Sequence, residues 1–270
     1  LPQPTRGVKA FAPCGGTRPR LGWRKAKHKA HAGTMNSILV GGDIPVILRR
    51  SARARRMTLR VARAGGEVVL TLPNRVSVQD GRAFAESRAE WLRRMRAQMP
   101  ALQIVGHGAM LPVEGRARLV TPSDQRRVAL TDEALLVPQG RPAGVVVAAF
   151  LKHLAHARLS AACDRHAGAL GRPFHALSLR DTRSRWGSCT HDGRLMFSWR
   201  LAMAPPEVLD YVAAHEVAHL AHMDHSPAFW AATARLMPDY ARHRAWLRAH
   251  GHELLAWRFR DDEDAGPAGD

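Results

Sequence analysis

Four histidines lie within eleven positions of one another in the stretch AAHEVAHLAHMDHSPAFW, residues 213–230. His215 and His219 are four positions apart, so on a helix they lie one turn apart on the same face. Both imidazoles can then reach one metal ion at about 2.0–2.1 Å, the usual Zn–N distance. Glu216 lies beside the pair, where its carboxylate can take a proton from an activated water without binding the metal. The spacing predicts a zinc-dependent hydrolytic site.

The third metal ligand has to come from another part of the same stretch, because a catalytic zinc usually takes three protein ligands and leaves a fourth position to water. His222, His225 and Asp239 compete for this place. On a continuing helix, His222 would lie too far along the axis. Ser226-Pro227 is typical of the cap and first position of a new helix, so the chain is expected to turn sharply before it and bring His225 to the ion. We expect His222 to be solvent-facing or outside the ligand set, and Asp239 to cap a helix.

The elements around the motif predict a helix that follows a β-hairpin. Residues 190–193 have turn chemistry, and apolar residues alternate through 195–201, which predicts a strand with one apolar face. Residues 205–207, Pro-Pro-Glu, are typical of a helix start. Upstream, a long helix is expected from Pro142 to about Leu170, with Val146, Phe150, Leu154 and Leu159 able to face a core.

The first half of the chain is expected to be rich in strands. Apolar runs from Ile44 to Leu72, interrupted by a turn at 64–66, predict a small antiparallel sheet. Ser77 can cap one helix that runs to about Met99. Its expected buried stripe consists of Phe84, Trp91, Leu92 and Met95. Short alternating stretches in 100–142 predict further strands.

The net charge of +18 is concentrated near the N-terminus, because residues 1–60 hold 14 Lys/Arg and one acid, Asp43. Residues 1–34, with eight Lys/Arg and no acid, are expected to be a disordered basic leader. They could bind nucleic acid, or they could be upstream sequence with Met35 as the native start. Arginines 49–56 could bind phosphate, although a solvated strand edge is the more usual outcome. Residues 259–270 are expected to be an acidic, disordered tail.

The composition and the cysteines indicate a cytoplasmic protein. The three cysteines match neither a disulfide framework nor a metal knuckle. The most apolar run, at 145–150, is too short to cross a bilayer, so no transmembrane helix and no membrane partner are expected. Cys189 is expected to be a buried thiol. Five aromatic residues are expected in the core: Trp186, Phe197, Trp199, Phe229 and Trp230.

Several motifs together resemble the YgjP-like zinc metallopeptidases, which are related to the WLM, SprT-type and minigluzincin peptidases. They are RWGSC at 185–189, the strand RLMFSWRL, the helix with HEVAH and the following HSPAFW. The resemblance also extends upstream to RRSARARRMTLRV and Trp91. The resemblance covers roughly residues 40–258. Ser198 departs from it, since similar sequences commonly carry Asn there.

The resemblance implies an α+β fold in which a β-rich region with one helix, residues 35–140, precedes a minigluzincin-like zincin unit at 141–258. This unit would consist of a helix, a β-hairpin, the HExxH helix and C-terminal helices. The resemblance also implies that His215, His219 and His225 hold one Zn²⁺ and that Glu216 is catalytic, in agreement with the spacing.

The sequence therefore predicts a zinc metallopeptidase that hydrolyses peptide bonds in a peptide or protein substrate. If the second strand of the hairpin is a free edge, an extended peptide could add to it. Arg183 and Arg185 could contact substrate or stabilise the transition state, or form structural ion pairs, and Tyr211 could approach the site from one turn upstream. The alternative is a basic nucleic-acid-associated protein with a structural or vestigial zinc. A closed four-ligand site would favour this alternative.

Overall fold

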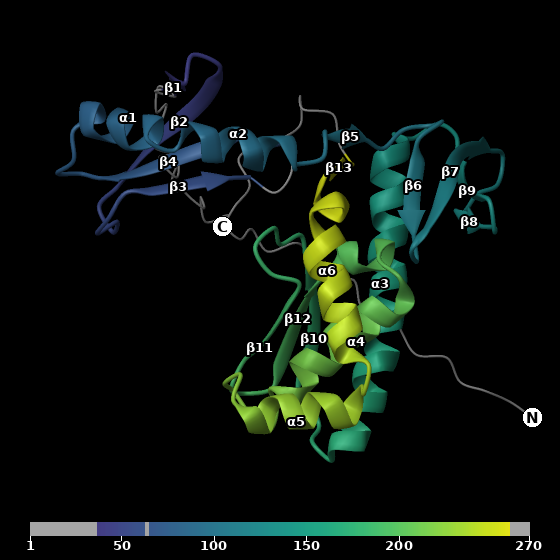
Figure 1. Cartoon of the computed structure of the whole chain (residues 1–270). Helices are drawn as coiled ribbons and strands as arrows, with labels where there is room; N and C mark the ends of the chain where they lie inside the picture. The colour runs from purple at the N-terminus through teal and green to yellow at the C-terminus, as the bar shows by residue number, and fades with distance from the viewer. Residues whose placement is uncertain (1–36, 63–64, 260–270) are drawn as a thin grey trace, which may run out of the picture. The chain divides into compact units, whose positions relative to one another are not determined.

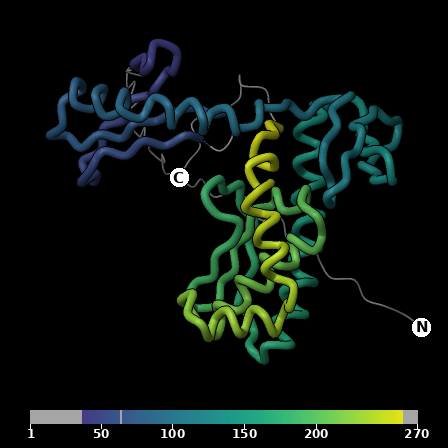
Figure 2. The backbone as a smooth tube through the Cα atoms, in the orientation of Figure 1, coloured from purple at the N-terminus to yellow at the C-terminus, as the bar shows by residue number. Residues whose placement is uncertain are grey.

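The computed structural model describes residues 37–62 and 65–259, and Figure 1 shows how their helices and strands are arranged. The predictions for the leader at 1–34 and for the acidic tail beyond 259 lie outside these residues. Within them the fold is mixed α and β, with helices and several separate sheets, so the general class expected from the sequence is confirmed. The backbone can be followed by colour in Figure 2.

The first sheet contains four strands in the order β1-β2-β4-β3. These strands are β1 (Ser37–Val40), β2 (Ile44–Ser51), β3 (Thr58–Val61) and β4 (Val68–Pro73). The sheet is mixed and not antiparallel as expected, because β2 and β4 pair in parallel. β4 lies between β2 and β3 in the centre of the sheet. Its residues Val68, Leu70 and Leu72 are all buried and pack in the same hydrophobic core as the buried residues of β2.

Two helices, α1 (Val78–Glu86) and α2 (Ala89–Ala97), replace the single helix expected here. Ser77 caps α1 as predicted, since its hydroxyl accepts a hydrogen bond from the Asp80 amide. The helix ends at Ser87, whose own hydroxyl donates to the Phe84 carbonyl and competes with the regular backbone bonds. In α2, Leu92 is buried as expected, whereas Trp91 is exposed and not buried as expected.

The second four-stranded sheet confirms the strands expected in 100–142. Its strands are β6 (Met110–Val113), β7 (Arg116–Ser123), β8 (Ala129–Leu130) and β9 (Ala134–Pro138), in the order β6-β7-β9-β8. One face carries apolar side chains into the main core, among them Leu111, Val120 and Leu135. Two short strands, β5 (Gln103–Ile104) and β13 (Trp257–Arg258), pair in parallel and join the chain before this sheet to the end of the last helix.

The long helix α3 (Ala143–Leu170) has the expected bounds, and Gly171 ends it in a left-handed conformation with φ 70°. Leu159 is buried as expected, but the rest of the fully buried stripe runs one position later than expected, through Val147, Leu151 and Ala155. By length and composition α3 could cross a membrane, with a mean hydropathy of 1.2 over 18 residues. This is weak evidence for a membrane span, because a core helix has the same properties and α3 packs into the main core.

The third sheet holds the predicted hairpin. Its strands are β10 (Ala176–Arg180), β11 (Gly187–Cys189) and β12 (Arg194–Ser198), in the order β10-β12-β11. The turn at 190–193 joins β11 to β12 as expected. The second strand, β12, is central and paired on both sides, so the edge strands are β10 and β11.

The chain beyond Ser198 forms a 3-10 helix, η1 (Trp199–Met203), where the alternation predicted more strand. All five of its residues are buried, which no single strand face would allow. Arg200 explains the change, because its buried guanidinium binds the Asp181 carboxylate at 2.6 Å and the carbonyls of Leu254 and Trp257 at 3.0 and 2.9 Å. This arginine ties η1 to the end of the last helix.

Three helices complete the chain: α4 (Pro206–Ala218), α5 (Pro227–Leu236) and α6 (Tyr240–Leu255). Pro206 occupies the first turn of α4, as the sequence predicts. α4 contacts α3, α5, α6 and the edge strand β11 (Figure 1). Most of its side chains are buried. The helix that carries the HEVAH motif is therefore held from several sides by the core.

Candidate metal centre

The end of α4 positions the first two histidines. His215 lies in its last turn, and His219 is the residue that directly follows its last position, still in the right-handed helical conformation. The two imidazole rings are 5.1 Å apart between centroids. The i, i+4 arrangement expected from the sequence is therefore present, with Glu216 between the two histidines in the chain.

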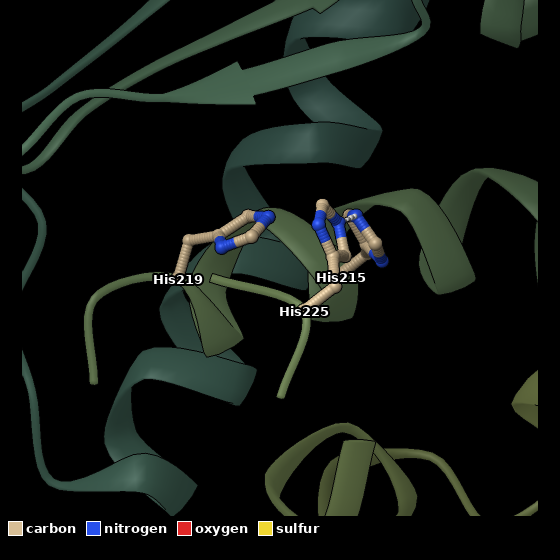
Figure 3. A group of neighbouring side chains, drawn as sticks. All are labelled: His215, His219 and His225. Carbon is tan, nitrogen blue, oxygen red and sulfur yellow. Dashed lines mark hydrogen bonds between the residues drawn. The ribbon is translucent and has the colours of Figure 1, made fainter. Parts of the chain in front are cut away.

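The chain turns sharply after α4, as the sequence predicts. The Asp224 carboxylate accepts a hydrogen bond from the Ser226 amide at 3.3 Å, and the Ser226 hydroxyl caps α5 by accepting from the Phe229 amide at 3.4 Å. This turn brings His225 back to the helix end, where its Nε2 lies 3.2 Å from Nε2 of His215. Figure 3 shows the three imidazoles gathered at this place.

The three rings have the geometry of a metal-binding group. One ring nitrogen from each of His215, His219 and His225 lies within 4.8 Å of the other two. Two ligands on a tetrahedral zinc with bonds of 2.0–2.1 Å are about 3.3 Å apart, close to the 3.2 Å between His215 and His225. Within residues 37–62 and 65–259 no fourth metal-ligating side chain joins this group. The donor set fits a three-ligand site with an open position.

His222 takes part through its backbone and not through its ring. The His222 carbonyl lies 2.9 Å from Nδ1 of His219 and can accept its proton. A hydrogen bond of this kind fixes the tautomer and the orientation of a metal-binding imidazole, and leaves Nε2 free for the ion. His222 therefore lies outside the three-histidine group, as expected.

Burial favours the neutral form of His215 and His219, the form that a metal requires. Burial, together with the neighbouring His219, His225 and Arg244, lowers the pKa of His215 to about 3. Burial also lowers the pKa of His219. The Nδ1 atom of His215 is buried without a hydrogen-bond partner among the described residues, so this ring is oriented by packing.

Glu216 is buried beside the histidines, with 5% of its surface exposed. Burial raises the pKa of its carboxyl to about 8, and the positive charge of Arg185 acts in the opposite direction. Its carboxylate lies against Gly187 of β11, where a Cβ atom would come within 2.5 Å of Oε1. A carboxylate in such surroundings has a high proton affinity, as a general base needs.

Aromatic rings enclose the histidines on the side of α5. Phe229 stacks on His219 with 4.4 Å between ring centroids and is fully buried, as expected for a core residue. Trp230 is different, because it is only partly buried and its ring lies 5.8 Å from those of both His215 and His225. The sequence placed Trp230 in the core, whereas it borders the histidine group.

The other predicted site residues, Tyr211, Arg183 and Arg185, differ in how close they lie to the histidine group and Glu216. The ring of Tyr211 lies 5.9 Å from that of His215, so Tyr211 does approach the group, and burial raises its pKa to about 12. Arg185 is exposed and close enough to act on the charge of Glu216. Arg183 is exposed, and no contact among the described residues joins it to the histidines. Neither arginine forms an ion pair in the part of the chain that the structure describes.

Comparison with known proteins decides the family. A family model described as the YgjP-like metallopeptidase domain matches residues 55–250, which is most of the chain. The chain belongs to the YgjP-like metallopeptidases. A search of curated proteins finds no match. Among solved structures, the zymogen of the metallopeptidase abylysin from Pyrococcus abyssi has 18% identity and a TM-score of 0.31, and the match covers 33% of this chain and 92% of that one.

Two features of this YgjP-like domain were missed by the reasoning from sequence. Gly187 touches Glu216, and a glycine inside a short strand is a known sign of close approach by another group. His166 of α3 is buried and lies 2.8 Å from the Asp210 carboxylate of α4, which also binds Arg165. No pattern in the sequence links these two helices, because the contact joins residues 44 positions apart.

Proposed function

We propose that this YgjP-like metallopeptidase hydrolyses peptide bonds with one zinc ion held by His215, His219 and His225, and with Glu216 as general base. The convergence of the three imidazoles beside a buried carboxylate carries the proposal. The minigluzincin-like arrangement, the cytoplasmic location and the peptide or protein nature of the substrate are parts of the same proposal.

Each residue has a defined task in this mechanism. A zinc ion at the three histidines would polarise the scissile carbonyl and acidify the attacking water. Glu216 accepts the proton of this water and later passes it to the leaving amine. The burial of Glu216 and its contact with Gly187 fix the position of the carboxylate. The His222 carbonyl accepts the Nδ1 proton of His219, which leaves Nε2 unprotonated and able to bind the zinc ion.

The edge strand β11 is the proposed docking place for an extended substrate. β11 is paired only with β12 among the described strands, and its first residue, Gly187, lies next to Glu216. A peptide that adds to this edge would run past the general base with its backbone paired. This assigns the role to the first strand of the hairpin, where the sequence suggested the second.

The number of ligands argues against a purely structural metal. Structural zinc sites have four protein ligands, whereas the described residues supply three and leave His225 exposed. Nucleic-acid binding by the N-terminal sheet is a second candidate function, favoured by one observation. Five arginines around β2 and β3 have no ion-pair or side-chain hydrogen-bond partner within the described residues: Arg49, Arg53, Arg55, Arg56 and Arg60.

The experiment that tests the enzyme uses the substitution Glu216→Gln, which preserves size and removes the proton acceptor. We expect the variant to keep one equivalent of zinc and to digest a degenerate peptide library roughly 10²–10⁴-fold more slowly than the wild type. Metal analysis and mass spectrometry of the digests give the two readouts. Unchanged cleavage by the variant would rule out Glu216 as the base, and the same preparations in an oligonucleotide anisotropy assay test the second candidate.

A further inference from the structure

Helix α6 places an arginine next to the histidine group. The guanidinium carbon of Arg244 lies 4.5 Å from the ring centroid of Trp230, and the same ring lies 5.8 Å from those of His215 and His225. Trp230 also stacks on Tyr240, one turn before Arg244 on α6. The indole thus holds the cation near the metal site by a cation–π contact while the arginine stays exposed.

Two further arginines, Arg248 and Arg185, come from elements that border the histidine group and Glu216. Arg248 lies four positions after Arg244 on α6, so the two side chains project from the same face of this helix. Arg185 comes from the segment before β11 and acts on Glu216. The two elements touch, because the Trp186 indole packs on Gly251 of α6 so closely that a Cβ there would be 2.9 Å from Cζ2.

The positive charge of these three arginines is not neutralised by neighbours. Within the described residues none of their guanidinium groups forms an ion pair or a side-chain hydrogen bond, and all three are exposed. Glu216 is buried and faces Gly187, and Asp224 is bonded to Ser226 in the turn beyond His219. A structural role through ion pairs, one of the two alternatives for Arg185, therefore has no support in this region.

We propose that Arg185, Arg244 and Arg248 form an anionic subsite, so that the preferred substrates are peptides with a carboxylate close to the scissile bond. The carboxylate belongs either to an Asp or Glu side chain or to a free C-terminus. That the bound peptide is a substrate rests on the proposed function, but its binding to the three arginines can be measured without hydrolysis. Arginine suits this task because its planar, permanently charged group binds carboxylates with two parallel hydrogen bonds.

Binding is measured in zinc-loaded protein that carries Glu216→Gln, so that no probe is consumed. Three fluorescein-labelled octapeptides of one sequence serve as probes: one with two Glu residues and an amidated C-terminus, one with Gln in their place and the amide, and one with Gln and a free carboxylate. We expect one or both carboxylate peptides to bind at least fivefold more tightly than the Gln amide. The peptide that gains identifies the source of the carboxylate.

The variants Arg244→Gln and Arg248→Gln, in the same background, test the residues. Each should weaken binding of the preferred peptide roughly two- to fivefold, the range for exposed charge pairs, and leave the Gln amide unchanged. Arg242→Gln removes an exposed arginine from the same helix and is the matched control, with no change expected. In the parent protein, 500 mM salt should abolish most of the preference because exposed charges are screened.

The outcomes separate the inference from the proposed function. Equal binding of all three peptides, or a preference that survives in both variants, overturns the anionic subsite. If the preference is found but zinc-loaded wild type cleaves none of the peptides or library members, the subsite stands and the peptidase assignment fails. If the library is cleaved but carboxylates are not enriched near the cut bonds, the peptidase assignment stands and the anionic subsite fails.

Discussion

Gly187 of β11 lies against the side chain of Glu216 of α4, so closely that a Cβ atom at position 187 would be 2.5 Å from Oε1 and 2.6 Å from Cγ. Distances below 3.0 Å are essentially never seen for real Cβ atoms. The edge strand and the HEVAH helix therefore approach one another as closely as they do because residue 187 has no side chain. The contact makes the glycine of the RWGSC motif a positioning residue for the carboxylate.

The first prediction is that Gly187→Ala displaces Glu216 and slows catalysis while the metal stays bound. The new methyl group cannot fit without a shift of the carboxylate, and a misplacement of about 1 Å can cost on the order of 10²-fold in rate. We expect kcat to fall roughly 10–100-fold with zinc content unchanged. Gly168→Ala is the matched control, because a Cβ at position 168 of α3 meets nothing within 4 Å. Equal rates in the two variants would show that the contact is irrelevant to catalysis.

The second prediction separates His225 from His222. Removing one of three ligands should abolish most of the zinc affinity, whereas removing a residue outside the ligand set should cost 10–100-fold at most. We therefore expect His225→Ala to purify largely without zinc, as His215→Ala and His219→Ala should. His222→Ala should retain close to one equivalent, because only its backbone carbonyl contacts His219.

Metal analysis after dialysis against a weak chelator distinguishes the four variants. Melting temperatures of the same samples show whether any loss of zinc comes from a general loss of structure. If His222→Ala lost the metal and His225→Ala kept it, the third-ligand assignment would be wrong. Because the two histidines are three positions apart in one turn, each serves as the control for the other.

The histidine group could be anticipated because its geometry is local. A single helical turn sets the separation of His215 and His219, and the Ser226-Pro227 cap requires the chain to turn and return His225. The bounds of α3 followed in the same way from Pro142 and Gly171. Such features depend on residues within a few positions of one another, which is where reasoning from sequence has the most power.

The features that could not be anticipated depend on contacts between distant segments. The alternation after Ser198 was typical of a strand, but the ion pair of Arg200 with Asp181 and its bonds to carbonyls near residue 255 favour a 3-10 turn. The parallel pairing of β2 with β4 likewise depends on which strand becomes central. Trp230 was placed in the core because hydrophobicity alone does not reveal that one of its faces borders the histidines.

The link between α3 and α4 shows how a distant contact supports the metal site. Nε2 of His166 lies 2.8 Å from Oδ1 of Asp210, and Arg165 binds the same carboxylate. Asp210 lies five positions before His215 on α4, so this contact joins α3 to the helix that carries His215. Burial alone would raise the pKa of Asp210, but the hydrogen bond from His166 and the charges of His166 and Arg165 lower it overall.

The last prediction rests on this lowered pKa. A carboxyl whose pKa is lower in the folded state than in the unfolded chain, where it is about 3.9, stabilises the fold above that pH. The contribution disappears as the pH falls through the folded pKa, when both states become protonated. Asp210→Asn should therefore lower the free energy of unfolding by roughly 1.5–3 kcal/mol near pH 6, as expected for a hydrogen bond to a charged group. The difference from wild type should shrink progressively as the pH falls below the unfolded value and through the lowered folded pKa.

Urea unfolding of metal-free wild type and variant at several pH values measures this difference. Metal-free protein is needed because protonated histidines release zinc in acid, which would add a second pH-dependent term. Asp164→Asn is the control, since Asp164 is an exposed residue of the same helix as His166 and has no ion-pair partner among the described residues. Its difference from wild type should be close to zero throughout. A difference for Asp210→Asn that stayed constant or grew as the pH fell would contradict the lowered pKa, and with it the role of the Asp210 charge in joining α4 to α3.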